Sequence, residues 1–123
     1  MNRLPFTKLA AKALEEGKEI AKYLGFRDVS TTFLMLGLLG TDGSMASEVL
    51  KMHGLTRQMV ESYVQEKASA SKDGRKKLAY TPKAEEILEL AGETALKYGC
   101  DSIGTEHILM AIIREGDNEA VRL

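Results

Sequence analysis

Apolar residues recur at three- and four-residue steps along the first part of the sequence, between Thr7 and Gly25. This spacing places them on one face of a helix. The hydroxyl of Thr7 can accept a first-turn N–H, and Gly25 suits the left-handed position that follows a last turn. The pattern therefore predicts an amphipathic helix whose apolar face consists of Leu9, Ala10, Ala13, Leu14, Ile20, Ala21 and Leu24.

A nearly uninterrupted apolar run follows from Phe33 to Leu39, after the helix-start residues Ser30-Thr31-Thr32. A helix without a polar face has no side to turn to water, so this one is expected in the middle of a domain. A turn at 41–44 then leads to a third helix that ends at Gly54, and Thr56 caps a fourth. The apolar positions of these last two helices are Ala46, Val49, Leu50, Met52, Met59, Val60 and Val64.

The same pattern returns after 74 residues (80 minus 6), with Tyr80-Thr81 aligned on Phe6-Thr7 and no gap to the C-terminus. Thr81 and Gly99 bound a second long helix, and the run 108–113 repeats the apolar helix. A tandem duplication explains such a constant offset. We predict an all-α fold, a pseudo-twofold tandem repeat of a four-helix unit in a single domain over residues 1–123. Its parts are a first repeat at about 6–67, a linker at about 68–79 and a second repeat at about 80–123.

The second repeat stops at Leu123, inside its third helix, so we expect it to be incomplete and the chain to be cut from something longer. Completing the missing helices is expected to raise the melting temperature.

Composition narrows the function classes. The 123 residues carry 17 basic and 18 acidic side chains, a net charge of −1 that gives no field to attract nucleic acid or an acidic membrane. The basic linker residues Lys72, Arg75, Lys76 and Lys77 have no aromatic partner and suit a solvated linker better than a nucleic-acid contact. No apolar stretch approaches the roughly 20 residues that span a bilayer. A single cysteine, Cys100, is typical of a reducing compartment and favours the cytoplasm.

Motifs for catalysis are also missing from the sequence. No Gly-rich phosphate loop is present, so this segment is expected neither to bind nor to hydrolyse ATP. His53 and His107 lie in separate repeats, and Cys100 has neither a metal-ligand partner nor a base at a recognisable spacing. We predict no catalytic site, no metal site and no cofactor in this segment.

Glu106-His107 is the pair of adjacent residues that could most readily have a chemical role. It could act as an acid and a base, or Glu106 could simply complement the positive end of its helix. A third interpretation is a ligand site, because the helix starts at Thr81 and Thr105 offer N–H groups to an anion while Glu106 offers a carboxylate to a cation. The apolar residues Met35, Leu36 and Met110 could line a peptide groove, but their helical spacing favours the core.

Two sequence blocks carry a family resemblance. Tyr80-Thr81-Pro82-Lys83-Ala84 and the block from Gly104-Thr105-Glu106-His107 to Arg114-Glu115-Gly116 resemble the repeat of the Clp N-terminal domain. That domain precedes the AAA+ modules of Hsp100 unfoldases, and the linker length is closer to the ClpC type than to the ClpA type. The resemblance implies a non-catalytic docking domain for adaptors of the MecA type and for protein substrates, which the ring passes to the ClpP peptidase. ATP and Mg²⁺ would belong to the AAA+ modules.

The resemblance further implies a phosphoarginine site, in which a Glu of the Gly-Thr-Glu-His block binds the guanidinium and a helix-opening Thr binds the phosphate. By position in the repeat, Thr81 and Glu106 form this site in the second copy. The first copy keeps Thr7 but has Thr32 in place of the carboxylate. A neutral hydroxyl is a poor acceptor for a guanidinium, so the first site is expected to be weak or lost.

Two other functions stay open at this stage. A free-standing accessory protein could regulate a Clp protease without a ring of its own, and the DNA after codon 123 would distinguish it from an unfoldase. A small enzyme could use Glu106 and His107, and a turnover screen with Glu106→Ala would reveal it.

Overall fold

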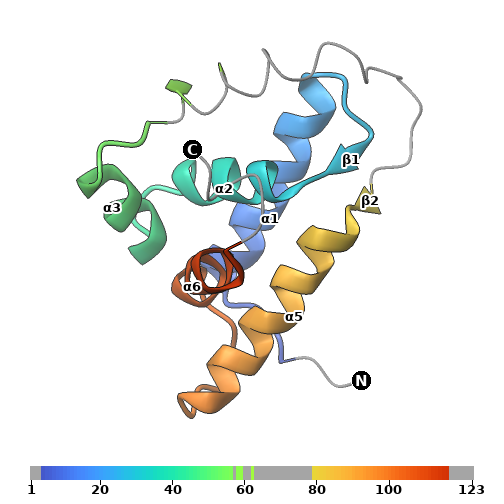
Figure 1. Cartoon of the computed structure of the whole chain (residues 1–123). Coiled ribbons are helices and arrows are strands. Elements are labelled where there is room, and N and C mark those ends of the chain that lie inside the picture. Colours follow the sequence, from blue (N-terminus) through green and yellow to red (C-terminus); the bar gives the residue numbers. More distant parts are fainter. Residues whose placement is uncertain (1–3, 57, 60–61, 63–78, 117–123) are drawn as a thin grey trace.

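The computed structural model describes residues 4–56, 58–59, 62 and 79–116, which form a bundle of helices with two very short strands (Figure 1). The predicted linker, apart from Ala79, and the end of the second repeat lie outside the described residues. So does most of the predicted fourth helix, although the N–H of Met59 donates to Thr56 Oγ1 at 3.2 Å, as the predicted cap requires. The elements are α1 (Lys8–Tyr23), β1 (Asp28–Val29), α2 (Thr31–Leu39), α3 (Met45–Met52), β2 (Ala79–Tyr80), α5 (Pro82–Lys97) and α6 (Thr105–Glu115).

The repeat predicted from the sequence is confirmed in the helices. α1 and α5 are both 16 residues long and begin 74 residues apart (82 minus 8). Each starts at a threonine whose Oγ1 accepts an N–H three residues later at 3.1 Å, Thr7 from Ala10 and Thr81 from Ala84. α2 and α6 start at the same offset. One local pattern has therefore produced one local fold twice.

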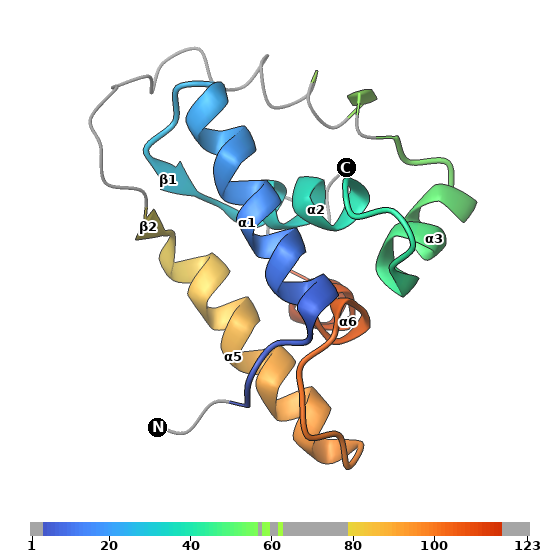
Figure 2. The ribbon, with the colours of Figure 1, turned by 180° about the vertical axis from the view of Figure 1, so that it is seen from behind.

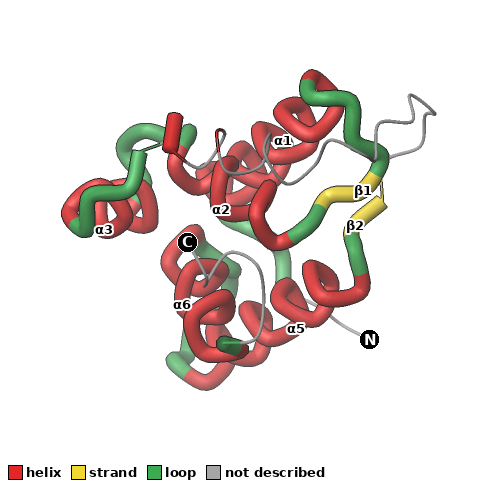
Figure 3. Tube along the Cα trace, turned by 45° about the horizontal axis from the view of Figure 1, so that its top comes forward, coloured by secondary structure: helices red, strands yellow, loops and turns green. Residues whose placement is uncertain are grey.

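Short parallel strands connect the two repeats, which an all-α prediction did not include. Val29 of β1 pairs with Tyr80 of β2, side by side in Figure 3. Phe6 forms an isolated parallel bridge with Ile103. Because Phe6 is equivalent to Tyr80 and Val29 to Ile103, the two pairings are copies of each other. In each repeat, the residue that precedes the N-cap of the long helix therefore pairs with the other repeat, as expected for a twofold relation.

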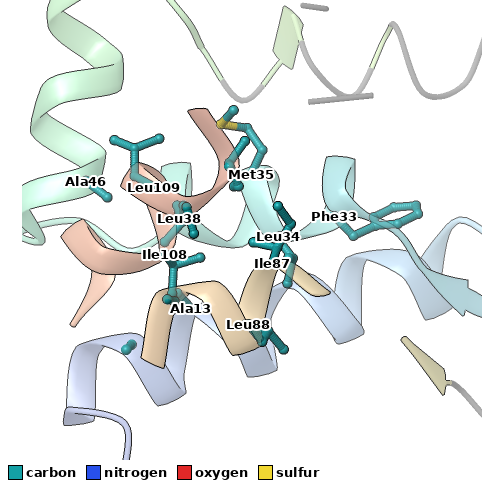
Figure 4. Packing of buried hydrophobic residues seen from close by; sticks show 14 of the residues in the cluster. Ala13, Phe33, Leu34, Met35, Leu38, Ala46, Ile87, Leu88, Ile108 and Leu109 are labelled. Carbon is teal, nitrogen blue, oxygen red and sulfur yellow. The ribbon is translucent and has the colours of Figure 1, made fainter. Parts of the chain in front are cut away.

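α2 is the centre of the core. All nine of its residues are buried, as a helix without a polar face should be. Figure 4 shows Leu34 and Leu38 of α2 among Ile87 of α5 and Ile108 of α6. Met35 and Leu36 are buried and Met110 is half-buried, so the interpretation of these three residues as core rather than groove is supported.

Two helices, α1 and α2, approach each other through glycines. A Cβ added to Gly37 would overlap the carbonyl oxygen of Ala13, and one added to Gly17 would collide with the carbonyl oxygen of Phe33. Neither neighbour is a flexible side chain; both are backbone. The crossing therefore requires glycine, whereas the equivalent positions of the second repeat are alanines, Ala91 and Ala111.

Some apolar positions are more exposed than their spacing predicted. α3 buries Ala46 and Leu50, but Val49 lies at the surface and Met52 is 82% exposed. Ile113 of α6 is 62% exposed, although its equivalent Leu39 is buried. Within the described residues, no helix has the length and apolar character needed to cross a membrane.

Candidate ligand-binding pocket

An open pocket of about 420 Å³ lies where three helices begin. Figure 2 shows the start of α1 next to the start of α6. The third helix is α3, whose first residue, Met45, contributes an exposed apolar side chain. The lining residues are Thr7, Lys8, Leu9, Met45, Gly104, Thr105 and Glu106.

The strand-like bridge between the repeats holds the pocket together. The N–H of Thr7 donates to the carbonyl of Ile103 at 2.9 Å, and the N–H of Ile103 donates to the carbonyl of Pro5 at 2.8 Å. On the far side, Thr105 Oγ1 accepts the N–H of Ala46 at 3.4 Å. The starts of α1 and α6 are thus tied by backbone bonds, and the start of α3 is tied to α6 through the Thr105 hydroxyl.

The α1 side of the pocket suits an anion. The N–H groups of Lys8 and Leu9 point out of the first turn, and among the described residues no group accepts them. They lie at the positive end of the helix dipole. Thr7 Oγ1 accepts the N–H of Ala10, which leaves its hydroxyl hydrogen available to a ligand. Lys8 adds an exposed ammonium group that has no ion-pair partner in the part of the chain the structure describes.

The α6 side offers a carboxylate. Glu106 is half-buried in the first turn of α6 and, within the described residues, forms no ion pair. Its carboxylate lies over Gly104, because a Cβ added there would be only 2.6 Å from Oε1. The Lys8 ammonium group and the Glu106 carboxylate therefore line one pocket without forming an ion pair with each other.

His107 has a structural task that limits its use as a base. Its ring is buried, and Nδ1 accepts the N–H of Gly104 at 2.9 Å. The ring proton is then on Nε2, which lies 3.7 Å from Cys100 Sγ. Cys100 Sγ in turn faces the carbonyl of Tyr98 at 4.0 Å. The sequence assigned no base to Cys100; the structure places His107 beside it, but with no lone pair to accept the thiol proton.

The structure does not bring Thr81 and Glu106 together. Lys83 Nζ contacts Glu115 Oε2 at 2.8 Å, so the start of α5 lies at the end of α6, and Glu106 is at the opposite end of that helix. The N–H of Thr81 donates to the carbonyl of Val29 at 3.0 Å, in the first repeat. The exchange of strands between repeats is the reason: Glu106 meets Thr7 instead.

Comparison with known proteins identifies the family. The model of the Clp repeat (R) N-terminal domain matches residues 5–123. This chain belongs to the Clp N-terminal domain family. It is 34% identical over 118 residues to the chaperone protein ClpB of Oceanobacillus iheyensis. It is 33% identical over 118 residues to the negative regulator of genetic competence ClpC/MecB of Bacillus subtilis.

Each of these two alignments covers 96% of this Clp N-terminal domain and 15% of the relative, so the chain spans about 15% of the length of these relatives. Among solved structures, the N-terminal domain of the caseinolytic protease associated chaperone ClpD from Arabidopsis thaliana superposes with a TM-score of 0.71 at 26% identity. That match covers 95% of this chain and 82% of the other. The predicted family and fold are confirmed.

The Thr7–Glu106 pocket lies at one corner of this Clp N-terminal domain. The corner that the repeat makes equivalent to it, at the start of α5, has different chemistry. There the start of α5, at Thr81, meets the start of α2, through the bond to Val29. Thr32 takes the place of Glu106 and is 1% exposed. Pro82 takes the place of Lys8 and has no N–H to offer. The Glu106 carboxylate and the Lys8 N–H of the Thr7–Glu106 pocket therefore have no counterparts at this corner.

Proposed function

We propose that this Clp N-terminal domain is the non-catalytic docking module of a ClpC-type AAA+ unfoldase that feeds proteins to the ClpP peptidase in the cytoplasm. Its partners would be protein substrates and adaptors of the MecA type, and ATP and Mg²⁺ would be bound by AAA+ modules. The observation that carries the proposal is the Thr7–Glu106 pocket, which combines helix N–H groups with a carboxylate that has no ion-pair partner among the described residues.

We propose phosphoarginine in a protein substrate as the ligand. Its phosphoryl group would accept from the N–H groups of Lys8 and Leu9 and from the Thr7 hydroxyl, at the positive end of α1. Its guanidinium would donate to the Glu106 carboxylate, a charge-assisted bond with matched planar geometry. One modified side chain would then satisfy both sides of the pocket.

The apolar part of the pocket supports the same ligand. Leu9 is 41% exposed and Met45 is 61% exposed, and both line the pocket. Apolar side chains of this kind can pack against the aliphatic stem of an arginine. A phosphoserine has too short a stem to use them, and unmodified arginine lacks the phosphoryl group.

A matched pair of threonine variants tests this proposal. Thr7→Ala and Thr81→Ala each remove one helix cap of the same geometry, so both should cost the fold about 1 kcal/mol. Only Thr7 lines the pocket. Calorimetry with a phosphoarginine peptide should show about tenfold weaker binding for Thr7→Ala, the scale of a hydrogen bond to a charged group. Thr81→Ala should bind like the parent. The reverse order, or no binding by the parent, would refute the proposed site.

A further inference from the structure

The first turn of α6 contains half of a capping box with an unusual acceptor. In a capping box the side chain of the third helical residue accepts the N–H of the N-cap, and that residue is normally Glu or Gln. Here the N-cap is Gly104 and the acceptor is Nδ1 of His107, at 2.9 Å. His107 is 6% exposed, so this bond is shielded from competing water.

The same glycine supports the carboxylate of the pocket. A Cβ on Gly104 would lie 2.6 Å from Glu106 Oε1 and 3.0 Å from Oε2. The backbone of Gly104 is extended, with φ −98° and ψ 175°, so other residues could adopt it without strain. A larger residue here would displace the flexible Glu106 side chain, so glycine leaves the Glu106 carboxylate the place that it occupies beside the Gly104 backbone.

The equivalent corner lacks all three of these residues. Ser30, Thr32 and Phe33 stand where Gly104, Glu106 and His107 stand in the second repeat. Phe33 is buried and packs edge-on against Phe26, with ring centroids 5.0 Å apart. A phenyl ring thus fills this place in the fold, but it cannot accept an N–H. Where the carboxylate is absent, so are the glycine and the imidazole acceptor.

We infer that His107 is a positioning residue of the Thr7–Glu106 pocket: by accepting the Gly104 N–H it fixes the backbone against which the Glu106 carboxylate rests. This inference rests on the proposed function for its ligand. It gives His107 a role in recognition without any contact between the imidazole and the ligand.

The test uses two replacements of His107. His107→Phe copies the first repeat, keeps the bulk and removes the acceptor, whereas His107→Gln restores the usual capping-box acceptor. Calorimetry with phosphoarginine should show about fivefold weaker binding for His107→Phe, the scale of one neutral hydrogen bond, and near-parental binding for His107→Gln. Equal affinities for His107→Phe and the parent would overturn the inference.

A double-mutant cycle separates positioning from general loss of stability. In a Glu106→Ala background there is no carboxylate to position, so His107→Phe should not weaken binding further. An equal loss in both backgrounds would show a merely structural role. Gly104→Ala, which displaces the carboxylate and leaves His107 in place, should weaken binding in the same Glu106-dependent way; a loss independent of Glu106 would count against the inference.

A measurement without ligand distinguishes this inference from the proposed function. Hydrogen exchange of the Gly104 amide should be slow in the parent and in His107→Gln, and faster in His107→Phe. If the parent does not bind phosphoarginine, the proposed function fails, yet the exchange rates still report whether His107 holds Gly104. Fast exchange in the parent would overturn the inference whatever the ligand.

Discussion

Gly37→Ala is expected to be the most destabilising single-methyl change in this domain. The new Cβ would overlap the carbonyl oxygen of Ala13 and lie 3.0 Å from the N atom of Gly17, and both are backbone atoms that cannot rotate away. α1 and α2 would have to separate, although α2 is buried along its whole length. Overpacking of this kind costs about 1 to 3 kcal/mol and occasionally more. Thermal unfolding should show a melting temperature lower by about 4 to 12 °C.

The repeat supplies the matched control. Ala111 occupies the equivalent position in α6, and Ala111→Gly should cost only about 1 kcal/mol, the usual penalty for glycine inside a helix. A Gly37→Ala protein that melts within about 2 °C of the parent would show that the two helices do not cross as closely as described.

These glycines illustrate how far the sequence alone could specify the fold. Thr7, Gly25, Thr81 and Gly99 mark the ends of the long helices by local chemistry, and the constant offset predicts the duplication, so helices and repeat were predictable. Local pattern does not say which helices approach closely enough to need Gly37. Pairings of one or two residues, such as Phe6 with Ile103, are too short to show the alternation of apolar and polar residues that indicates a strand, so the sequence did not predict the strands.

Glu106→Gln is expected to weaken phosphoarginine binding by roughly one to two decades. The change keeps size and shape but removes the charge that the guanidinium requires, and hydrogen bonds to charged groups contribute about 1.5 to 3 kcal/mol. The fold should change little, since an acidic residue at a helix start contributes about 0.3 to 1 kcal/mol. Calorimetry with a phosphoarginine peptide measures the affinity, and thermal unfolding measures the stability.

Glu85→Gln is the control for the loss of charge, because Glu85 is an exposed acidic residue in the first turn of α5, at the other corner. It should leave the affinity unchanged. Phosphoserine and arginine peptides control the ligand, and neither should bind the parent as tightly as phosphoarginine. Equal losses in Glu85→Gln and Glu106→Gln would mean that the domain responds to overall charge and has no carboxylate site.

The candidate site was predictable in its parts but not in its assembly. Thr7, Thr81, Glu106 and Thr32 were all recognised from sequence, through the capping pattern and the Gly-Thr-Glu-His block. Position along the chain suggested that residues of one repeat act together. The exchange between repeats depends on backbone bonds such as that of Thr7 to Ile103, which no side-chain pattern encodes. Met45 was missed because it comes from a third helix.

The crossed pairing of Thr7 with Glu106 is the central claim, and amide chemical shifts in a phosphoarginine titration test it most directly. The largest changes should occur at the amides of Lys8, Leu9, Thr105 and Glu106, which are residues that line the pocket. The amides of Lys83 and Thr32, at the equivalent corner, should stay unchanged. Changes of equal size at both corners, or changes confined to Thr32 and Lys83, would contradict the account.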